Sequence, residues 1–160
     1  MSKMKWKLVW AGALVACAFG GIAIGVAGAT PGAGVTRTIL TGPVLLEDVD
    51  LKSHSDVNKV KIQMKGFTDV YVVHYKFAPG GHSGWHSHPG PCMVSVKSGT
   101  ATEYRSDDPN TPYDFPAGTG FVENVGHAHL VRNEGTTDLE LVVIHIVPFG
   151  APIRIDEPAP

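Results

Sequence analysis

The stretch GGHSGWHSHPGPCMVSVKSG, residues 80–99, holds three of the chain's eight histidines and one of its two cysteines. Glycine and proline interrupt its first half, whereas MVSVKS (93–98) alternates apolar and polar residues as a β-strand does. His86 and His88 are two positions apart, and on a strand residues i and i+2 project from the same face. Both imidazoles could therefore reach one metal ion.

A second histidine pair with the same spacing lies further along the chain. His127 and His129 stand at the start of another predicted strand, residues 128–133. Pairs of this kind also occur among solvent-exposed histidines, but two of them in one small β-rich chain favour a metal site.

The residues around these pairs predict an all-β fold. Helical periodicity is almost absent, and short runs rich in Val, Thr, Ile, Tyr and Phe are separated by Gly, Pro, Asn and Asp. The predicted strands are 37–40, 60–64, 70–77, 93–98, 100–105, 120–124, 128–133 and 139–147. Many short strands with regular turns indicate an antiparallel sandwich or barrel.

Alternation along these strands predicts which side chains face the interior. Ser95, Lys97, Glu140 and Lys76 favour solvent, so their immediate neighbours are expected to point inward. The inward residues are then Cys92, Val94 and Val96; Leu139, Leu141, Val143, His145 and Val147; and Tyr71, Val73, Tyr75 and Phe77.

The N-terminus has the features of an export signal. Residues 1–7 carry three lysines, and residues 8–29 are uncharged and long enough to cross a bilayer at about 1.5 Å per residue. The segment fits a signal peptide cleaved after Ala29 or a retained anchor helix, and residues 14–17 also resemble a lipobox ending at Cys17. A secreted or extracytoplasmic protein is expected, with membrane contact only through residues 8–29 if they are retained.

The remaining residues are enough for one domain. We expect a linker at 30–36, the β domain at 37–149 and a Pro-rich tail at 150–160. Of thirteen basic residues three precede residue 30, so ten remain against fifteen acidic residues, a net charge of about −5. This balance argues against a nucleic-acid partner.

The spacing of the histidines resembles the two motifs of the cupin family. The matching patterns are Gly80-x5-His86-x-His88-x3-Cys92-x6-Gly99 and Gly118-x5-Asn124-x-Gly126-x2-His129-x3-Asn133. Cys92 stands where the first motif usually has Glu, and Asn124 stands where the second usually has Pro. The chain is most similar to small, exported, single-domain type-2 cupins of actinobacterial type. The resemblance implies an antiparallel jelly-roll barrel, and cupins often dimerise, so a homodimer is a further expectation.

The resemblance also implies a metal site at the mouth of the barrel. Its ligands by position are His86, His88 and His129, and the cofactor would be one divalent transition metal, namely Fe, Zn or Mn. His127 is expected at the rim, and His145 and Tyr75 are candidates for groups that support the ligands.

Three interpretations of Cys92 remain open. It could ligate the metal directly, which would favour a softer ion such as Zn or Cu(I). It could be a non-ligand beside an open three-histidine face, as in cupin thiol dioxygenases, some of which cross-link such a cysteine to a tyrosine; here Tyr75 would be available. It could also be a small buried filler.

Two functions fit this site, and whether the protein is an enzyme stays open. The first is a metal-dependent dioxygenase of a small organic or thiol substrate, and the second is non-catalytic binding of a metal or small ligand at the cell surface. The expected cavity lining is apolar and suits a small aliphatic or aromatic ligand. It comprises Phe77, Trp85, Met93, Val94, Val96, Phe121 and Val143.

Overall fold

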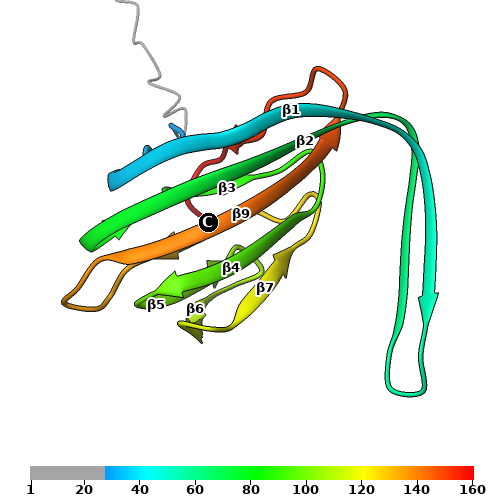
Figure 1. The fold of residues 1–160 in the computed structure, drawn as a ribbon. Helices are drawn as coiled ribbons and strands as arrows, with labels where there is room; N and C mark the ends of the chain where they lie inside the picture. The colour runs from blue at the N-terminus through cyan, green and yellow to red at the C-terminus, as the bar shows by residue number, and fades with distance from the viewer. Residues whose placement is uncertain (1–27) are drawn as a thin grey trace, which may run out of the picture.

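The structure, a computed structural model, describes residues 28–160, and these form ten β-strands (Figure 1). The strands are β1 (Ala33–His54), β2 (Lys59–His82), β3 (His86–Ser87), β4 (Cys92–Ser98), β5 (Thr100–Arg105), β6 (Asp108–Pro116), β7 (Gly120–Glu123), β8 (His129–Arg132), β9 (Leu139–Pro148) and β10 (Ile155–Asp156). The signal or anchor helix expected at the N-terminus, with Cys17, falls outside the described residues apart from its last two positions. Within residues 28–160 no helix is long and apolar enough to cross a membrane.

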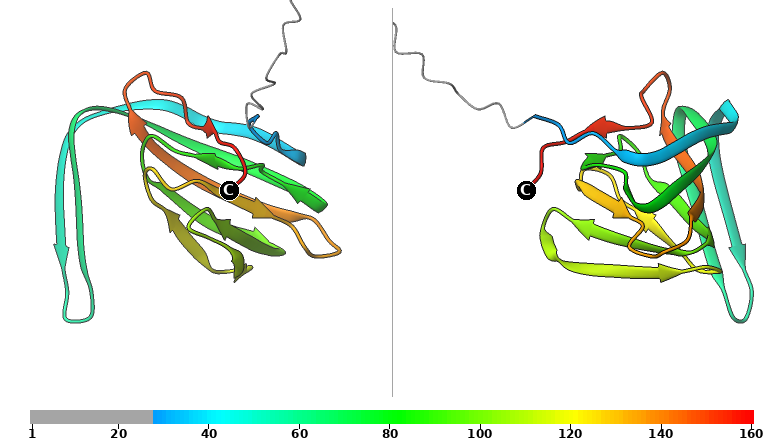
Figure 2. Two further views of the ribbon diagram at one scale, coloured as in Figure 1. Left: turned by 180° about the vertical axis from the view of Figure 1, so that it is seen from behind. Right: turned by 90° about the vertical axis from the view of Figure 1, so that its left-hand side faces the viewer.

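The strands form a nearly closed antiparallel barrel. They follow the order β10-β3-β8-β2-β9-β4-β7, with β1 paired to β2 and the β5–β6 pair joined to β8. Two layers of strands face each other in the rotated views (Figure 2). The expected all-β antiparallel barrel is thereby confirmed.

Burial follows the predicted alternation in the central strands. Residues of β4 and β9 alternate between buried and accessible, and Val73 and Phe77 of β2 are buried. The core cluster comprises Phe77, Cys92, Val94, Val96, Ala101, Val131, Leu139, Leu141 and Val143. Burial of apolar surface in this cluster is the main contribution to the stability of the barrel.

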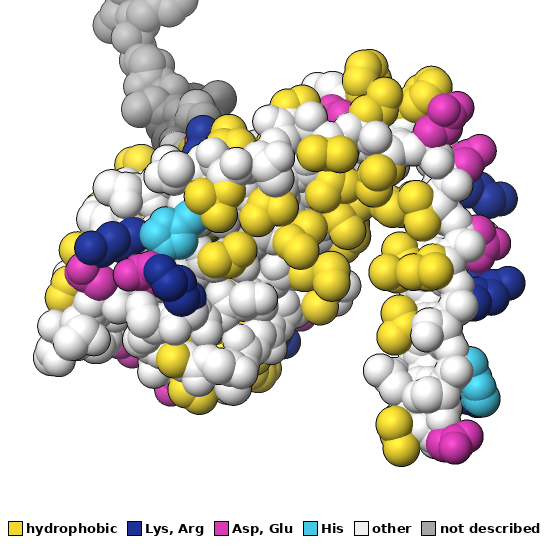
Figure 3. Space-filling view, viewed as in Figure 1, with side chains coloured by type: hydrophobic (Ala, Val, Ile, Leu, Met, Phe, Trp, Pro, Cys, Tyr) yellow, Lys and Arg dark blue, Asp and Glu magenta, His cyan; other side chains and the backbone are white. Residues whose placement is uncertain are grey.

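The first two strands are much longer than expected. They pair along nearly their whole length, as far as His54 opposite Lys59, and the far end of the hairpin extends away from the barrel (Figure 1). Apolar side chains gather on the face of the hairpin that is turned toward the barrel and on the neighbouring sheet (Figure 3). Those that are exposed on the two strands include Leu45, Leu51, Ile62 and Phe67.

Three segments differ from the expected boundaries. Residues 33–36, expected in a linker, belong to β1, because Val35 pairs with Phe77 and packs against the core. Residues 108–116, which lie between the predicted strands 100–105 and 120–124, form β6, an edge strand that pairs only with β5 among the described strands, where proline is tolerated. The Pro-rich tail contributes β10, which pairs with β3.

A buried asparagine fixes the end of the second motif. The side-chain amide of Asn133, which is 1% exposed, donates to the carbonyl oxygens of Phe77 (3.0 Å) and Thr137 (2.8 Å). Its oxygen accepts a hydrogen bond from the backbone N–H of Gly135 at 3.0 Å. The side chain thus joins the end of β2 to the loop between β8 and β9.

We expect Asn133→Ala to lower the free energy of unfolding by about 2 kcal/mol, because three backbone groups lose their partner and one of them, the Phe77 carbonyl, is in a buried hydrogen bond. Chemical denaturation of the purified protein measures this change. Asn58→Ala is the matched control, since the Asn58 side chain is exposed and makes no hydrogen bond within residues 28–160, and it should change stability by less than about 0.5 kcal/mol. Equal effects of the two variants would contradict the role given to Asn133.

Candidate metal centre

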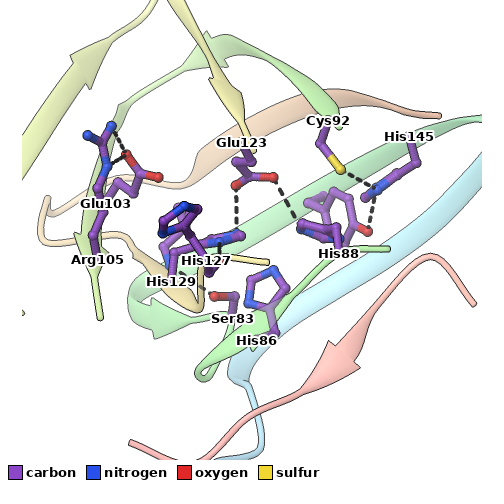
Figure 4. A network of polar contacts seen from close by, with 12 residues as sticks. Ser83, His86, His88, Cys92, Glu103, Arg105, Glu123, His127, His129 and His145 are labelled. Carbon is purple, nitrogen blue, oxygen red and sulfur yellow. Dashed lines mark hydrogen bonds and ion pairs between the residues drawn. The ribbon is translucent and has the colours of Figure 1, made fainter. Parts of the chain in front are cut away.

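Three histidines from two paired elements meet inside the barrel (Figure 4). His86 in β3 pairs with His129 in β8, and His88 follows β3 directly. All three side chains are buried, and their ring centroids lie 4.4 to 5.2 Å apart. One ligand atom from each lies within 4.8 Å of the others, so the structure brings the predicted three-histidine set together.

Each of these imidazoles is oriented by a main-chain contact. In every case Nδ1 lies within hydrogen-bonding distance of a carbonyl oxygen, which is an acceptor only, so Nδ1 carries the proton and donates it. The acceptors are Gly84 (2.9 Å) for His86, Ile153 (2.7 Å) for His88 and His127 (3.1 Å) for His129. This arrangement leaves the Nε2 lone pairs free to bind a metal, as in histidine ligands of known metal sites.

Glu123, at the end of β7, is a fourth polar group of this centre. Its two carboxylate oxygens lie 3.1 Å from Nε2 of His129 and 3.2 Å from Nε2 of His88. Both Nε2 atoms are buried, and despite these short distances neither makes a well-directed hydrogen bond within the described residues. Two buried nitrogen atoms that lack a directed hydrogen bond therefore lie next to a carboxylate. A metal cation between them would be bound by the nitrogen lone pairs and the carboxylate oxygens.

Our sequence prediction did not include Glu123, although a signal for it was present. Phe121 was expected to face the interior, and alternation along the same strand turns residue 123 to the same side. The register of the sheet places Glu123 directly opposite Cys92. The carboxylate of this centre therefore comes from β7, the neighbour of the strand on which the first cupin motif usually has its glutamate.

Burial and neighbouring charges both shift the pKa values of the groups in this centre, and they act in opposite directions on Glu123 and His129. Burial alone would raise the pKa of Glu123, but close contacts with His129 and His88 outweigh it and lower that pKa. For His129 burial would lower the pKa, and contact with Glu123 outweighs it and raises the pKa. Burial and the neighbouring His129 both lower the pKa of His86, which keeps this imidazole neutral and able to bind a metal.

Cys92 is fully buried and makes its closest polar contact outside this cluster. Its Sγ lies 3.0 Å from Nδ1 of His145, and Nε2 of His145 lies 3.1 Å from the hydroxyl of Tyr75. The ring of His145 therefore stands between Cys92 and Tyr75, the two residues of the cross-link considered above. Cys92, His145 and His88 form a second group with ligand atoms within 4.8 Å, so direct ligation by Cys92 would use a different set of residues.

The remaining candidates occupy distinct places. His127 is exposed and supports the centre through its carbonyl oxygen, which accepts from His129. It lines a second, smaller cavity together with Glu123 and His129. His145 and Tyr75 both line a larger cavity, which is described next.

A cavity of about 300 Å³ adjoins the cluster. Its apolar lining is Val35, Phe77, Val94, Val131, Leu141 and Val143, and its polar lining includes Arg37, Tyr75, Ser83, His86, His88, Glu123, His145, Arg154 and Asp156. The predicted lining was correct for Phe77, Val94 and Val143 and wrong for Met93, which is 45% exposed because it points to the outer face of β4. Trp85, Val96 and Phe121 are also absent from the lining.

The donors suit a divalent transition metal. Three neutral imidazole nitrogens and one carboxylate oxygen are ligands shared by Zn, Fe and Mn sites. The carbonyl contacts of the three Nδ1 atoms hold the ligands in place before any ion binds.

Comparisons with known proteins agree with this architecture. The family model described as Cupin domain matches residues 73–145, which include the three histidines, Cys92 and Glu123. No curated protein matches the chain.

Solved structures share the fold at low sequence identity. The polyketide cyclase RemF from Streptomyces resistomycificus has a TM-score of 0.53 at 13% identity, covering 80% of this chain and 74% of that one. A cupin-2 domain protein from Rhodospirillum rubrum has a TM-score of 0.53 at 13% identity, covering 79% and 68%. A cupin domain from Bordetella pertussis has a TM-score of 0.49 at 20% identity, covering 74% and 97%. Residues 73–145, somewhat under half of the chain, therefore match the Cupin domain family, and the two structures with TM-scores of 0.53 show that the barrel shares their fold.

Proposed function

We propose that the protein binds one divalent transition metal through His86, His88, His129 and Glu123 and acts on a small organic substrate in the adjoining cavity. The observation that carries this proposal is the convergence of three oriented imidazoles, two of which have Nε2 within 3.2 Å of the buried Glu123 carboxylate.

The donor set narrows the choice of metal. A carboxylate in place of the thiol as the fourth ligand favours Zn, Fe or Mn over Cu(I), which prefers sulfur. Burial raises the pKa of the Cys92 thiol, with a further contribution from Glu123, so this side chain stays a neutral thiol rather than a thiolate ligand.

The proposed reaction is an oxidation of the dioxygenase type. When bound, the metal would polarise the substrate, and iron would also allow reaction with O2. The protein supplies a partly apolar cavity that would hold the substrate beside the ligands, and the Tyr75 hydroxyl is a polar group on its wall. Non-catalytic metal or ligand binding is the alternative outcome of the assays below.

We expect the wild-type protein to retain about one metal ion per chain, and His129→Ala to lose most of it because one of three imidazoles is removed. Elemental analysis of the purified protein gives the metal content. His127→Ala is the control, two residues away on an exposed side chain, and should keep the wild-type content. Equal metal content in all three proteins would contradict the assigned site.

We expect Glu123→Gln to weaken binding of Zn²⁺ by at least about tenfold at pH 8, because the ion loses its anionic neighbour. Protons compete with the metal for imidazole, and Glu123 raises the pKa of His129, so this proton is held to a higher pH in the wild type. The Zn²⁺ affinity of each protein, relative to its own value at pH 8, should therefore begin to fall at a higher pH in the wild type than in the variant.

Calorimetric titration with Zn²⁺ across a pH series measures both effects. Glu134→Gln is the matched control, since Glu134 is exposed and its partner is the surface residue Tyr104. An unchanged affinity and pH profile in Glu123→Gln would show that the carboxylate is not part of the centre.

The proposed dioxygenase-type activity is tested by measuring oxygen uptake. Iron-loaded protein should consume O2 in the presence of one member of a panel of small organic acids and thiols, and His86→Ala should abolish this uptake. Metal binding without turnover for any member of the panel, with iron or manganese, would overturn the enzymatic proposal and leave the binding function.

A further inference from the structure

Two arginines line the same cavity as His86, His88 and Glu123, three of the four candidate metal ligands. Arg154, from the tail, makes an ion pair with Asp156 at 2.5 Å. Arg37, from β1, makes no ion pair and no side-chain hydrogen bond with any residue from 28 to 160. The cavity therefore contains one guanidinium whose hydrogen-bond donors are available to a ligand.

The register of the first two strands directs Arg37 toward Tyr75. The two residues are cross-strand partners, so their side chains lie on the same face of the sheet. Burial raises the pKa of Tyr75 to about 12, and the positive charge of Arg37 acts against this shift. Burial lowers the pKa of His145 to about 4, with a smaller contribution from Arg37 in the same direction. The guanidinium is thus electrostatically close to both side chains.

The Tyr75 hydroxyl and the Cys92 thiol both contact the ring of His145. The Sγ of Cys92 lies 3.0 Å from Nδ1, and the Tyr75 oxygen lies 3.1 Å from Nε2. In the tautomer that carries its proton on Nε2, the ring donates to the Tyr75 oxygen, and the hydroxyl hydrogen can then donate to a group in the cavity.

We propose that Arg37 and Tyr75 form an anion-binding subsite, and that the ligand of the cavity is a small organic carboxylic acid with a short apolar body. The carboxylate would accept hydrogen bonds from the guanidinium and the tyrosine hydroxyl, a charge-assisted arrangement for which arginine is well suited. This inference deepens the proposed function by naming the substrate class of the same site.

The formal charges along the cavity support an anionic ligand. Arg37 and Arg154 are balanced by Glu123 and Asp156, so the lining is neutral while its histidines are neutral. A divalent ion would add two positive charges, and a carboxylate would offset part of them. Arg37 is exposed, so its guanidinium stands at the open side of the cavity, where a ligand can enter. A neutral thiol would leave both the ion and Arg37 uncompensated.

The apolar lining limits the rest of the ligand. Six aliphatic or aromatic side chains surround a space of about 300 Å³, which lies at the small end of ligand cavities. A sugar or a nucleotide would lose hydrogen bonds to water against such walls, whereas a short hydrocarbon or a single ring would not.

Benzoate and its neutral analogue benzamide are the probes, because they share size and shape and differ in charge. Calorimetric titration is carried out on the full protein, loaded with Zn²⁺ and also metal-free. We expect wild-type protein to bind benzoate about tenfold or more tightly than benzamide, since one charge-assisted hydrogen bond is worth this much. Arg37→Gln should reduce the preference to less than about threefold, with metal content unchanged.

Lys76→Gln is the matched control. Lys76 is the next residue after Tyr75, faces solvent and pairs with Asp138, so the variant removes one positive charge outside the cavity. It should keep the wild-type preference for benzoate, whereas Tyr75→Phe should weaken benzoate binding and leave benzamide binding nearly unchanged.

Three outcomes would overturn the proposal. They are equal affinity of the wild type for the two probes, equal loss of preference in Arg37→Gln and Lys76→Gln, and no binding of benzoate up to millimolar concentration. Failure of the proposed function would give a different result. The protein would then bind no metal, but the metal-free titration would still show a preference for benzoate that depends on Arg37.

Discussion

The antiparallel register of four neighbouring strands is the constraint on which the site depends. It aligns Tyr71 of β2 with His145 of β9, His145 with Cys92 of β4, and Cys92 with Glu123 of β7. A slip of one residue between any two strands would turn the following members of this row to the outer face. The buried core residues on the same faces oppose such a slip, because it would expose them to water.

The resemblance to the two cupin motifs implied the histidine part of the centre, His86, His88 and His129. Alternation predicted the inward faces of β4 and β9, which their burial confirms. Both signals are local, since each depends on a few residues within one stretch of the chain. Glu123 was missed because its place in the centre depends on which strand lies beside Cys92, and this pairing links residues about thirty positions apart.

The tail was missed for a different physical reason. Its Pro-rich composition shows no strand periodicity, and β10 comprises only two residues. What holds the tail is a set of contacts with the loop of the first motif, including the backbone bond from Glu157 to Trp85 and the hydrogen bond from Ser87 to the Glu157 carboxylate. Through the carbonyl of Ile153, which orients His88, the last eleven residues become part of the metal centre. Side-chain contacts of this kind carry no periodic signal.

The replacement of the usual glutamate by Cys92 is best understood together with its neighbours. A carboxylate at position 92 would stand opposite Glu123 and beside His145, and two carboxylates at this depth would repel each other. A neutral thiol fills the same space without charge and lies 3.0 Å from Nδ1 of His145. In the proposed site the fourth ligand comes from β7, and the residue on β4 instead contacts His145, which in turn contacts the hydroxyl of Tyr75. Under this proposal the departure from the usual motif places the anionic ligand and the contact with His145 on adjacent strands.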